Sequence, residues 1–147
     1  MRYRNTKSLI AGIALMFTGA QVSAENAAEP LAIQKIMQDM SKNMQVITGA
    51  ISREDWALVE KTAPLIADHP QPPMFEKMRI FAFVNTDIGQ FKSHDGKTHE
   101  AARILGVTAA TGDGHAIIAD FATLQDTCLM CHEQFRKPFQ AYFYGEE

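Results

Sequence analysis

The apolar residues of this chain recur at three- and four-residue steps, and this spacing most restricts how the chain can fold. The stretch after Pro30 carries one such stripe: Ile33, Ile36, Met37, Met40, Met44, Ile47 and Ile51. A period near 3.6 residues places these side chains on one face of an α-helix. Sustained two-residue alternation is absent, and no Asn-Gly or Asp-Gly turn joins two strand-like runs. The sequence therefore predicts helices and no sheet.

Two further helices are expected in the middle of the chain. The second should start near Arg53, with Ser52 as its N-cap, and end before Pro70, because the residue before a proline is pushed out of the α region. The third should run from about Thr86 to Thr111. Between them, residues 69–85 contain three prolines and are interpreted as a connection that carries a short helix over 74–84.

A fourth helix is expected after the Gly-Asp turn, with Asp113 as its cap, and should stop near Lys137 because Pro138 follows. Four amphipathic helices with mostly short connections predict an all-α fold, an antiparallel four-helix bundle.

Residues 1–24 have the pattern of a secretory signal peptide. Basic side chains without an acid precede a short apolar stretch, Leu9 to Phe17, and the segment ends in Val22-Ser23-Ala24. The apolar stretch is well short of the roughly 20 residues that span a bilayer. We expect cleavage after Ala24, export to the periplasm, and a mature domain of residues 25–147 without a membrane span.

Charge argues against a nucleic-acid partner. The chain has 14 Lys+Arg against 17 Asp+Glu, and cleavage would remove three basic residues and no acidic one. A nucleic-acid-binding protein normally has a basic surface. An acidic surface is weakly indicative of a basic site on a partner protein.

The strongest chemical signal is Cys128-Leu129-Met130-Cys131-His132. Cys-x-x-Cys-His is the attachment signature of a c-type haem. Two thiols one helical turn apart can form thioether bonds with the two vinyl groups of a porphyrin, and the histidine can bind the iron. Both cysteines of the chain lie in this motif. We therefore expect one covalently attached haem c, with His132 as the proximal iron ligand.

Three other uses of the two cysteines have less support. A thioredoxin-type redox pair would need a strand before the motif. A structural disulfide has poor geometry across Cys-x-x-Cys within a helix. A zinc site would need two more ligands, for which His94 and His99 are the nearby candidates.

The position of the motif narrows the family. It lies sixteen residues from the end of the sequence, on the last predicted helix. The chain here resembles the class II cytochromes c, the cytochrome c′ family. The resemblance covers essentially all of residues 25–147. It is densest from Phe91 to the string Cys-x-x-Cys-His-x-x-Phe-Arg at residues 128–136, and weakest around residues 70–85.

The sixth coordination position of the iron determines the function that the resemblance implies. Low-spin members of the family close this position with a methionine of the first helix and carry electrons; high-spin members leave it open and bind NO or CO. Counted from the predicted helix ends, His132 and Met37 lie about 8 Å and 10 Å from one end of the bundle, and Met44 lies about 20 Å along. The segment Gln34–Met37, followed by Asn43-Met44, resembles the low-spin members, with Met37 at their ligand position.

The sequence thus predicts a monohaem carrier of single electrons with His132 and Met37 as iron ligands; the alternative is a high-spin gas binder. Arg136 lies one turn after His132 and is expected to place a cation beside the haem. Three aromatic residues are expected to pack on the porphyrin: Phe91, Phe121 and Phe135. The remaining histidines are expected in loops or on the surface rather than as ligands: His69, His94, His99 and His115.

The sequence offers no catalytic set of the usual kinds. We find no Ser/His/Asp arrangement, paired carboxylates or glycine-rich phosphate loop, and we expect no enzyme. The expected partners are periplasmic redox proteins, and the resemblance also allows a homodimer.

Overall fold

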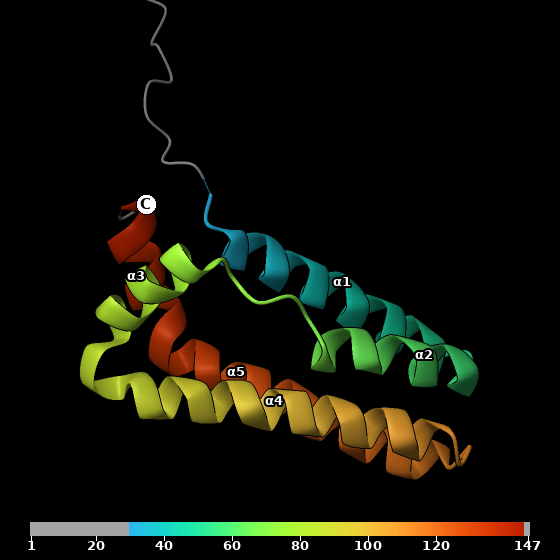
Figure 1. Ribbon diagram of the computed structural model, residues 1–147. Coiled ribbons are helices and arrows are strands. Elements are labelled where there is room, and N and C mark those ends of the chain that lie inside the picture. The colour runs from blue at the N-terminus through green and yellow to red at the C-terminus, as the bar shows by residue number, and fades with distance from the viewer. Residues whose placement is uncertain (1–29, 146–147) are drawn as a thin grey trace, which may run out of the picture.

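A computed structural model describes residues 30–145, and α-helices account for most of them (Figure 1). In chain order the elements are α1 (Ala32–Ile51), α2 (Trp56–Ala67), α3 (Met74–Val84), the 3₁₀ turn η1 (Asn85–Asp87), α4 (Ile88–Ala109) and α5 (Gly114–Tyr144). The described residues contain no strand. The predicted signal peptide lies outside them. No helix in this part of the chain has the length and apolar character needed to cross a membrane.

The four long helices pack as predicted into an antiparallel bundle. α1 packs on α2, α2 on α4, and α4 on α5, whereas α1 and α5 touch at few positions. Figure 1 shows α1 and α2 as one layer above α4 and α5, with α3 across the end at which α1 begins. The all-α four-helix bundle is thus confirmed, and the short helix in the α2–α3 connection corresponds to α3.

The packed core occupies one half of the bundle. Its buried residues come from the last turns of α1, from α2, from the second half of α4 and from the first half of α5. This core cluster comprises Ile47, Ala50, Val59, Ala63, Ile66, Ala67, Ala101, Ala102, Leu105, Ala109, Ile117 and Leu124. The Cys-x-x-Cys-His motif follows along α5 at the edge of this cluster, and its first cysteine, Cys128, packs against it.

The predicted start of α2 is wrong by about one turn. The hydroxyl of Ser52 donates to the carbonyl of Thr48 at 2.9 Å and so belongs to the end of α1. The carboxylate of Asp55 accepts from the backbone N–H of Leu58 at 3.1 Å, which makes Asp55 the N-cap. Between them Glu54 has a φ of 57°, a left-handed conformation that no helix interior contains. The helix therefore starts at Trp56.

The predicted end of α5 is also wrong, because the helix continues through Pro138 to Tyr144. Proline inside a helix removes a hydrogen bond and bends the axis, at a cost of about 3 kcal/mol. The ring of Phe83 on α3 lies 5.5, 5.2 and 5.7 Å from the rings of three residues beyond the proline: Phe139, Tyr142 and Phe143. This aromatic packing offsets the cost, and Figure 1 shows the last turns of α5 rising toward the start of α1.

The first turn of α1 is capped by a residue from another helix. The buried carboxylate of Glu76 on α3 accepts the backbone N–H groups of Ala32 and Ile33 at 2.7 and 2.8 Å. The N-cap position, Leu31, has no side chain that could do this. Glu76 thus satisfies two of the free donors of α1 and complements its dipole.

Replacing Glu76 with alanine is expected to lower the free energy of unfolding by about 1–3 kcal/mol, because two N–H groups lose their partner. Glu76→Gln keeps one acceptor oxygen and should lose less. Urea unfolding followed by circular dichroism measures both, with the exposed Glu60→Ala on α2 as control. Equal midpoints for Glu76→Ala and Glu60→Ala would show that the cap contributes nothing.

Candidate haem-binding site

The two cysteines of the motif are free thiols, both partly buried on α5. Burial raises the pKa of Cys128. Burial, with the negative charges of Asp95 and Cys128 nearby, raises the pKa of Cys131 to about 11. The thiolate is the form that attacks disulfides and binds metals. Protonated thiols at neutral pH therefore weigh against the thiol-redox and zinc alternatives, and in the described chain neither cysteine joins His94 or His99 in a metal-binding group.

The pKa of the motif histidine is shifted in the direction that favours a neutral ring. Partial burial, and then the charge of Arg136, lower the pKa of His132. A neutral imidazole has a lone pair free to bind a metal. Since Arg136 follows one turn later on the same helix, the structure brings these two predicted residues together, with Arg136 exposed.

The packing around the motif fits a large apolar group. Met44 packs against the core cluster. Met37 lies on the same face of α1 to within roughly 20°, yet 40% of it is exposed; Leu129, inside the motif, is 54% exposed. Nδ1 of His94 is buried without a hydrogen-bond partner. The exposed apolar side chain of Leu129, between the two thiols, is surface that a covalently held porphyrin would cover.

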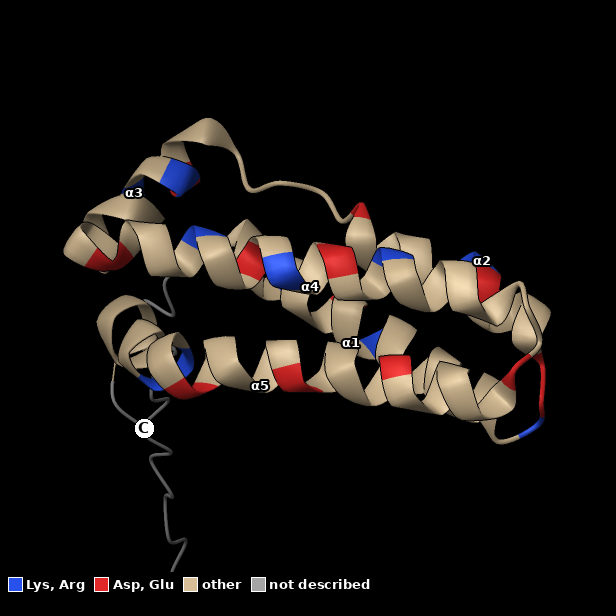
Figure 2. Ribbon diagram, turned by 90° about the horizontal axis from the view of Figure 1, so that it is seen from below, with Lys and Arg blue, Asp and Glu red and all other residues tan. Residues whose placement is uncertain are grey.

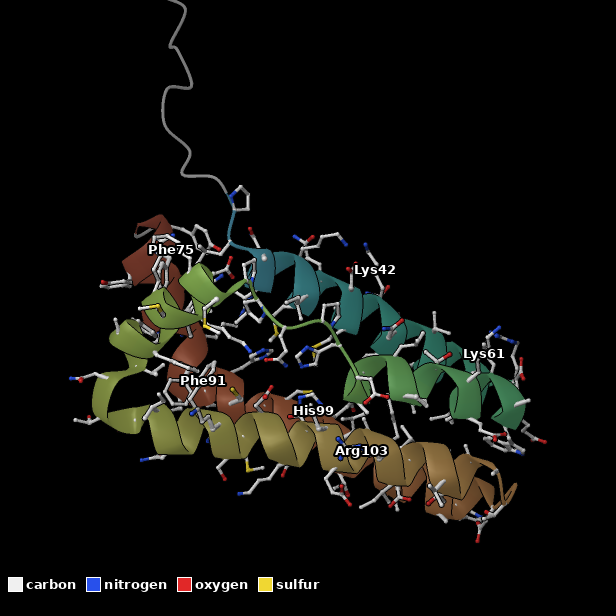
Figure 3. The ribbon with its side chains drawn as sticks, in the orientation of Figure 1. Lys42, Lys61, Phe75, Phe91, His99 and Arg103 are labelled. Carbon is white, nitrogen blue, oxygen red and sulfur yellow. The ribbon has the colours of Figure 1, made fainter. Side chains whose placement is uncertain are left out.

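One wall of this region is formed by α4 and α5. Phe91 packs edge-on against the buried Phe135, with ring centroids 5.3 Å apart (Figure 3). Nε2 of His94 donates to Oε1 of Gln134 at 3.2 Å, and Gln134 donates to Gln90 at 2.9 Å. The third predicted haem-contacting aromatic, Phe121, packs against the core cluster instead.

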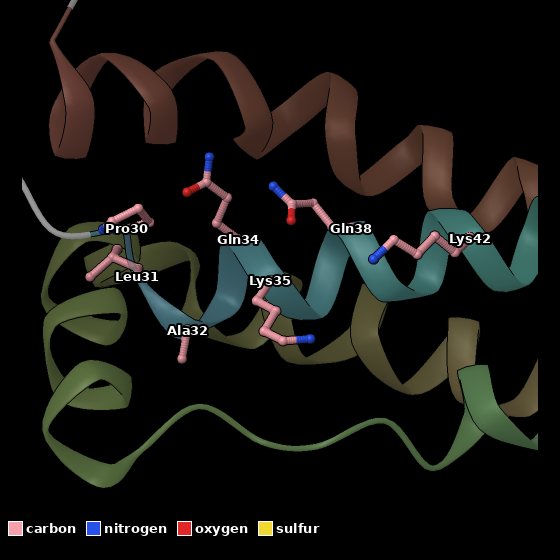
Figure 4. Close-up of a pocket in the computed structure, with 7 residues that line it drawn as sticks. All are labelled: Pro30, Leu31, Ala32, Gln34, Lys35, Gln38 and Lys42. Atoms are coloured by element: carbon pink, nitrogen blue, oxygen red, sulfur yellow. The ribbon is translucent and has the colours of Figure 1, made fainter. Parts of the chain in front are cut away.

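The position of Met37 on α1 follows from helical geometry relative to Gln34. In Figure 4, Gln34 and Gln38 extend toward α5, and at about 100° per residue Met37 lies roughly 60° around the helix from Gln34. The predicted match in height between Met37 and His132 was counted from a helix end near Lys137. That helix end is wrong, because α5 runs on to Tyr144. The assignment of Met37 as the distal ligand stays a prediction.

The hollow in Figure 4 is a separate feature. It has a volume of about 550 Å³ and is lined by Pro30, Leu31, Ala32, Gln34, Lys35, Gln38 and Lys42. No residue of the Cys-x-x-Cys-His motif lines it, so it is not the site at which the motif acts.

The remaining histidines differ in how far they are exposed. His115 is exposed, as predicted, whereas His94 and His99 on α4 are partly buried and not on the surface. Asp95 lies between His69 and His99, with Oδ1 3.6 Å from Nε2 of His69 and Oδ2 3.4 Å from Nε2 of His99. The Asp95 carboxylate raises the pKa of His69. Sequence reasoning missed this cluster; the one-turn spacing of Asp95 and His99 was its only signal.

Comparison with known proteins gives consistent matches. The model of a family described as Cytochrome C′ matches residues 31–136, a span that includes Met37 and the Cys-x-x-Cys-His motif. A protein named cytochrome c′ from Rhodospirillum rubrum is 27% identical over 144 residues, which cover 87% of this chain and 95% of that protein. No solved structure matches the chain significantly.

Proposed function

From the premise that the chain belongs to the cytochrome c′ family, whose members bind one covalently attached haem c, we propose that it carries single electrons in the periplasm. In this proposal Cys128 and Cys131 would attach the haem, and His132 and Met37 would bind its iron. Residues 1–24 direct export and are removed.

The observation that carries the electron-transfer proposal is the position of Met37. A methionine on a helix stripe usually fills core space. Met37 instead leaves 40% of its surface exposed, and helical geometry puts it roughly 60° around α1 from Gln34, which extends toward the helix that bears the motif. A thioether there is available to a neighbouring iron, and thioether ligation raises the reduction potential relative to two histidines.

The side chains of α5 have defined tasks in this proposal. Cys128 and Cys131 would each hold the haem through a thioether, formed by addition of the thiol S–H across one vinyl group without any oxidant or reductant. His132 would bind the iron through its imidazole. Arg136 supplies a cation near that imidazole. The bound haem supplies an iron that changes oxidation state by one electron.

Exposure of Met37 also supports a second candidate. None of the hydrogen bonds or core contacts of the described residues fixes its side chain, and a methionine turned away from the iron would leave a coordination position open. The protein would then be a high-spin cytochrome that binds NO or CO.

Absorption spectra of the oxidised and dithionite-reduced protein, before and after CO, distinguish the two. For the electron carrier we expect a low-spin reduced spectrum that CO does not change. Met37→Ala should convert it to a high-spin, CO-reactive form. Met44→Ala is the matched control, because Met44 shares the face of Met37 but packs on the core cluster; it should keep the low-spin spectrum.

A high-spin, CO-reactive spectrum of the unmutated protein would overturn the electron-carrier proposal in favour of the gas binder. A low-spin spectrum that persists in Met37→Ala would show that another residue binds the iron.

The proposed partners are redox proteins, and the protein is proposed to have no enzymatic activity of its own. A nucleic-acid partner is not proposed, since the chain has 14 Lys+Arg and 17 Asp+Glu and so no excess of positive charge. In Figure 2 residues of both signs are interspersed along α4 and α5, with no basic face in that view.

A further inference from the structure

Three side chains outside the haem-binding residues converge on one point beside α4. His69 belongs to the connection between α2 and α3, and Asp95 and His99 lie one turn apart on α4 (Figure 3). One ligand atom from each lies within 4.8 Å of the others. The two imidazole rings are stacked, with centroids 4.7 Å apart. Distant parts of the sequence thus bring two nitrogen donors and one carboxylate together.

Backbone hydrogen bonds orient both imidazoles. Nδ1 of His69 donates to the carbonyl of Pro70 at 2.9 Å, and Nδ1 of His99 donates to the carbonyl of Ala67. A proton held at Nδ1 leaves the Nε2 lone pair free, and in both residues Nε2 is the atom facing Asp95. Histidines that bind metals are generally fixed in this way, by donating the other ring N–H to a carbonyl or carboxylate.

The spacing of the donor atoms suits a small divalent cation. Tetrahedral zinc, with bonds of about 2.0–2.1 Å to nitrogen and oxygen, holds its ligand atoms roughly 3.3 Å apart. Here Nε2 of His69 lies 3.6 Å from Oδ1 of Asp95, and Nε2 of His99 lies 3.4 Å from Oδ2. The three ligand atoms lie within 4.8 Å of one another, so a shared ion would draw the two imidazoles slightly together around the carboxylate. The side chains of His69 and His99 are only 8% and 17% exposed, whereas that of Asp95 is 45% exposed. The site is therefore held by buried imidazoles and open to solvent at its carboxylate.

We propose that His69, Asp95 and His99 bind one divalent transition-metal cation of the zinc type, with water as the fourth ligand. Two imidazoles and one carboxylate favour Zn²⁺, Cu²⁺ or Ni²⁺ over Ca²⁺ and Mg²⁺, which prefer all-oxygen sites. The cation would tie the α2–α3 connection to α4.

The test is a zinc titration of the haem-loaded protein, followed by isothermal calorimetry. The protein is first treated with EDTA to remove any bound metal. We expect one equivalent of Zn²⁺ to bind the unmutated protein. His69→Gln and His99→Gln should each weaken binding by at least about 100-fold, since loss of an outer hydrogen-bond partner alone costs 10–100-fold. His115→Gln is the matched control, because His115 is exposed and outside the cluster; it should bind as the unmutated protein does.

Zinc-edge X-ray absorption of the unmutated protein keeps the test independent of the variants, should one of them fold poorly. Two imidazoles, further oxygen ligands and no sulfur are expected. Failure of the unmutated protein to bind zinc, binding that survives both histidine substitutions, or a sulfur ligand would overturn the site. Because none of its residues holds haem, these outcomes are separate from those of the Met37 experiment.

Discussion

Replacing both Cys128 and Cys131 with serine is expected to release the haem completely into acidified organic solvent, whereas the unmutated protein keeps it. Without the sulfurs no thioether can form, and the iron bond to His132 breaks when acid protonates the imidazole. Absorbance of the extracted and residual fractions measures the effect, and the mass of the denatured polypeptide shows directly whether haem is attached.

Leu129→Ser is the matched control for the cysteine experiment. Leu129 lies between the two cysteines and is 54% exposed, so this variant should retain its haem on extraction. Each single cysteine variant should remain attached through the other sulfur, with a reduced spectrum shifted to longer wavelength because one vinyl group stays conjugated. Retention of haem by the double variant would show that attachment uses other residues.

Replacing Leu105 with alanine is expected to lower the free energy of unfolding by about 3 kcal/mol. Leu105 is fully buried in the core cluster, so the substitution removes three heavy atoms and leaves a cavity among α-helices that cannot fully collapse. Its reduced absorption spectrum should stay low-spin, because Cys128 is the motif residue that packs on the core cluster and it is not a proposed iron ligand. Urea unfolding followed by circular dichroism gives the stability, and the spectrum is recorded on the same sample.

Val107→Ala provides the comparison on the same helix. Val107 is 73% exposed, and its loss should change stability by less than about 0.5 kcal/mol. If Leu105→Ala altered the haem spectrum as strongly as the stability, the two halves of the bundle would not be structurally separate.

The helices could be predicted because their signal is local and repeated. The stripe from Ile33 to Ile51 contains enough apolar residues at helical spacing to locate α1 within one residue of its observed bounds. The boundary errors occurred where one residue was given priority over tertiary packing. Pro138 does not stop α5, since Phe83 of α3 packs on the turns beyond it. Ser52 could cap α2 by its type, but its hydroxyl is used by α1.

In the candidate site, too, residues close in sequence could be predicted and residues brought together by folding could not. Cysteine, cysteine and histidine within five residues are chemically specific before any fold is known, and their assignment to haem attachment needs only a helix. The roles of residues brought together by folding cannot be obtained in this way. Asp95 and His99 are neighbours on one helix, but His69 is 26 residues before Asp95 and reaches it only because the α2–α3 connection passes alongside α4.

The start of the first helix and the end of the last helix are joined to each other at one end of the bundle. The backbone N–H of Leu31 donates to the hydroxyl of Tyr144, 113 residues away, at 3.3 Å. Next to it, Glu76 holds the first turn of α1. Helix ends usually fray independently, at little cost in free energy. We therefore expect the first turn of α1 and the last turn of α5 to open together, which hydrogen exchange would show as matched protection at the two ends of the domain.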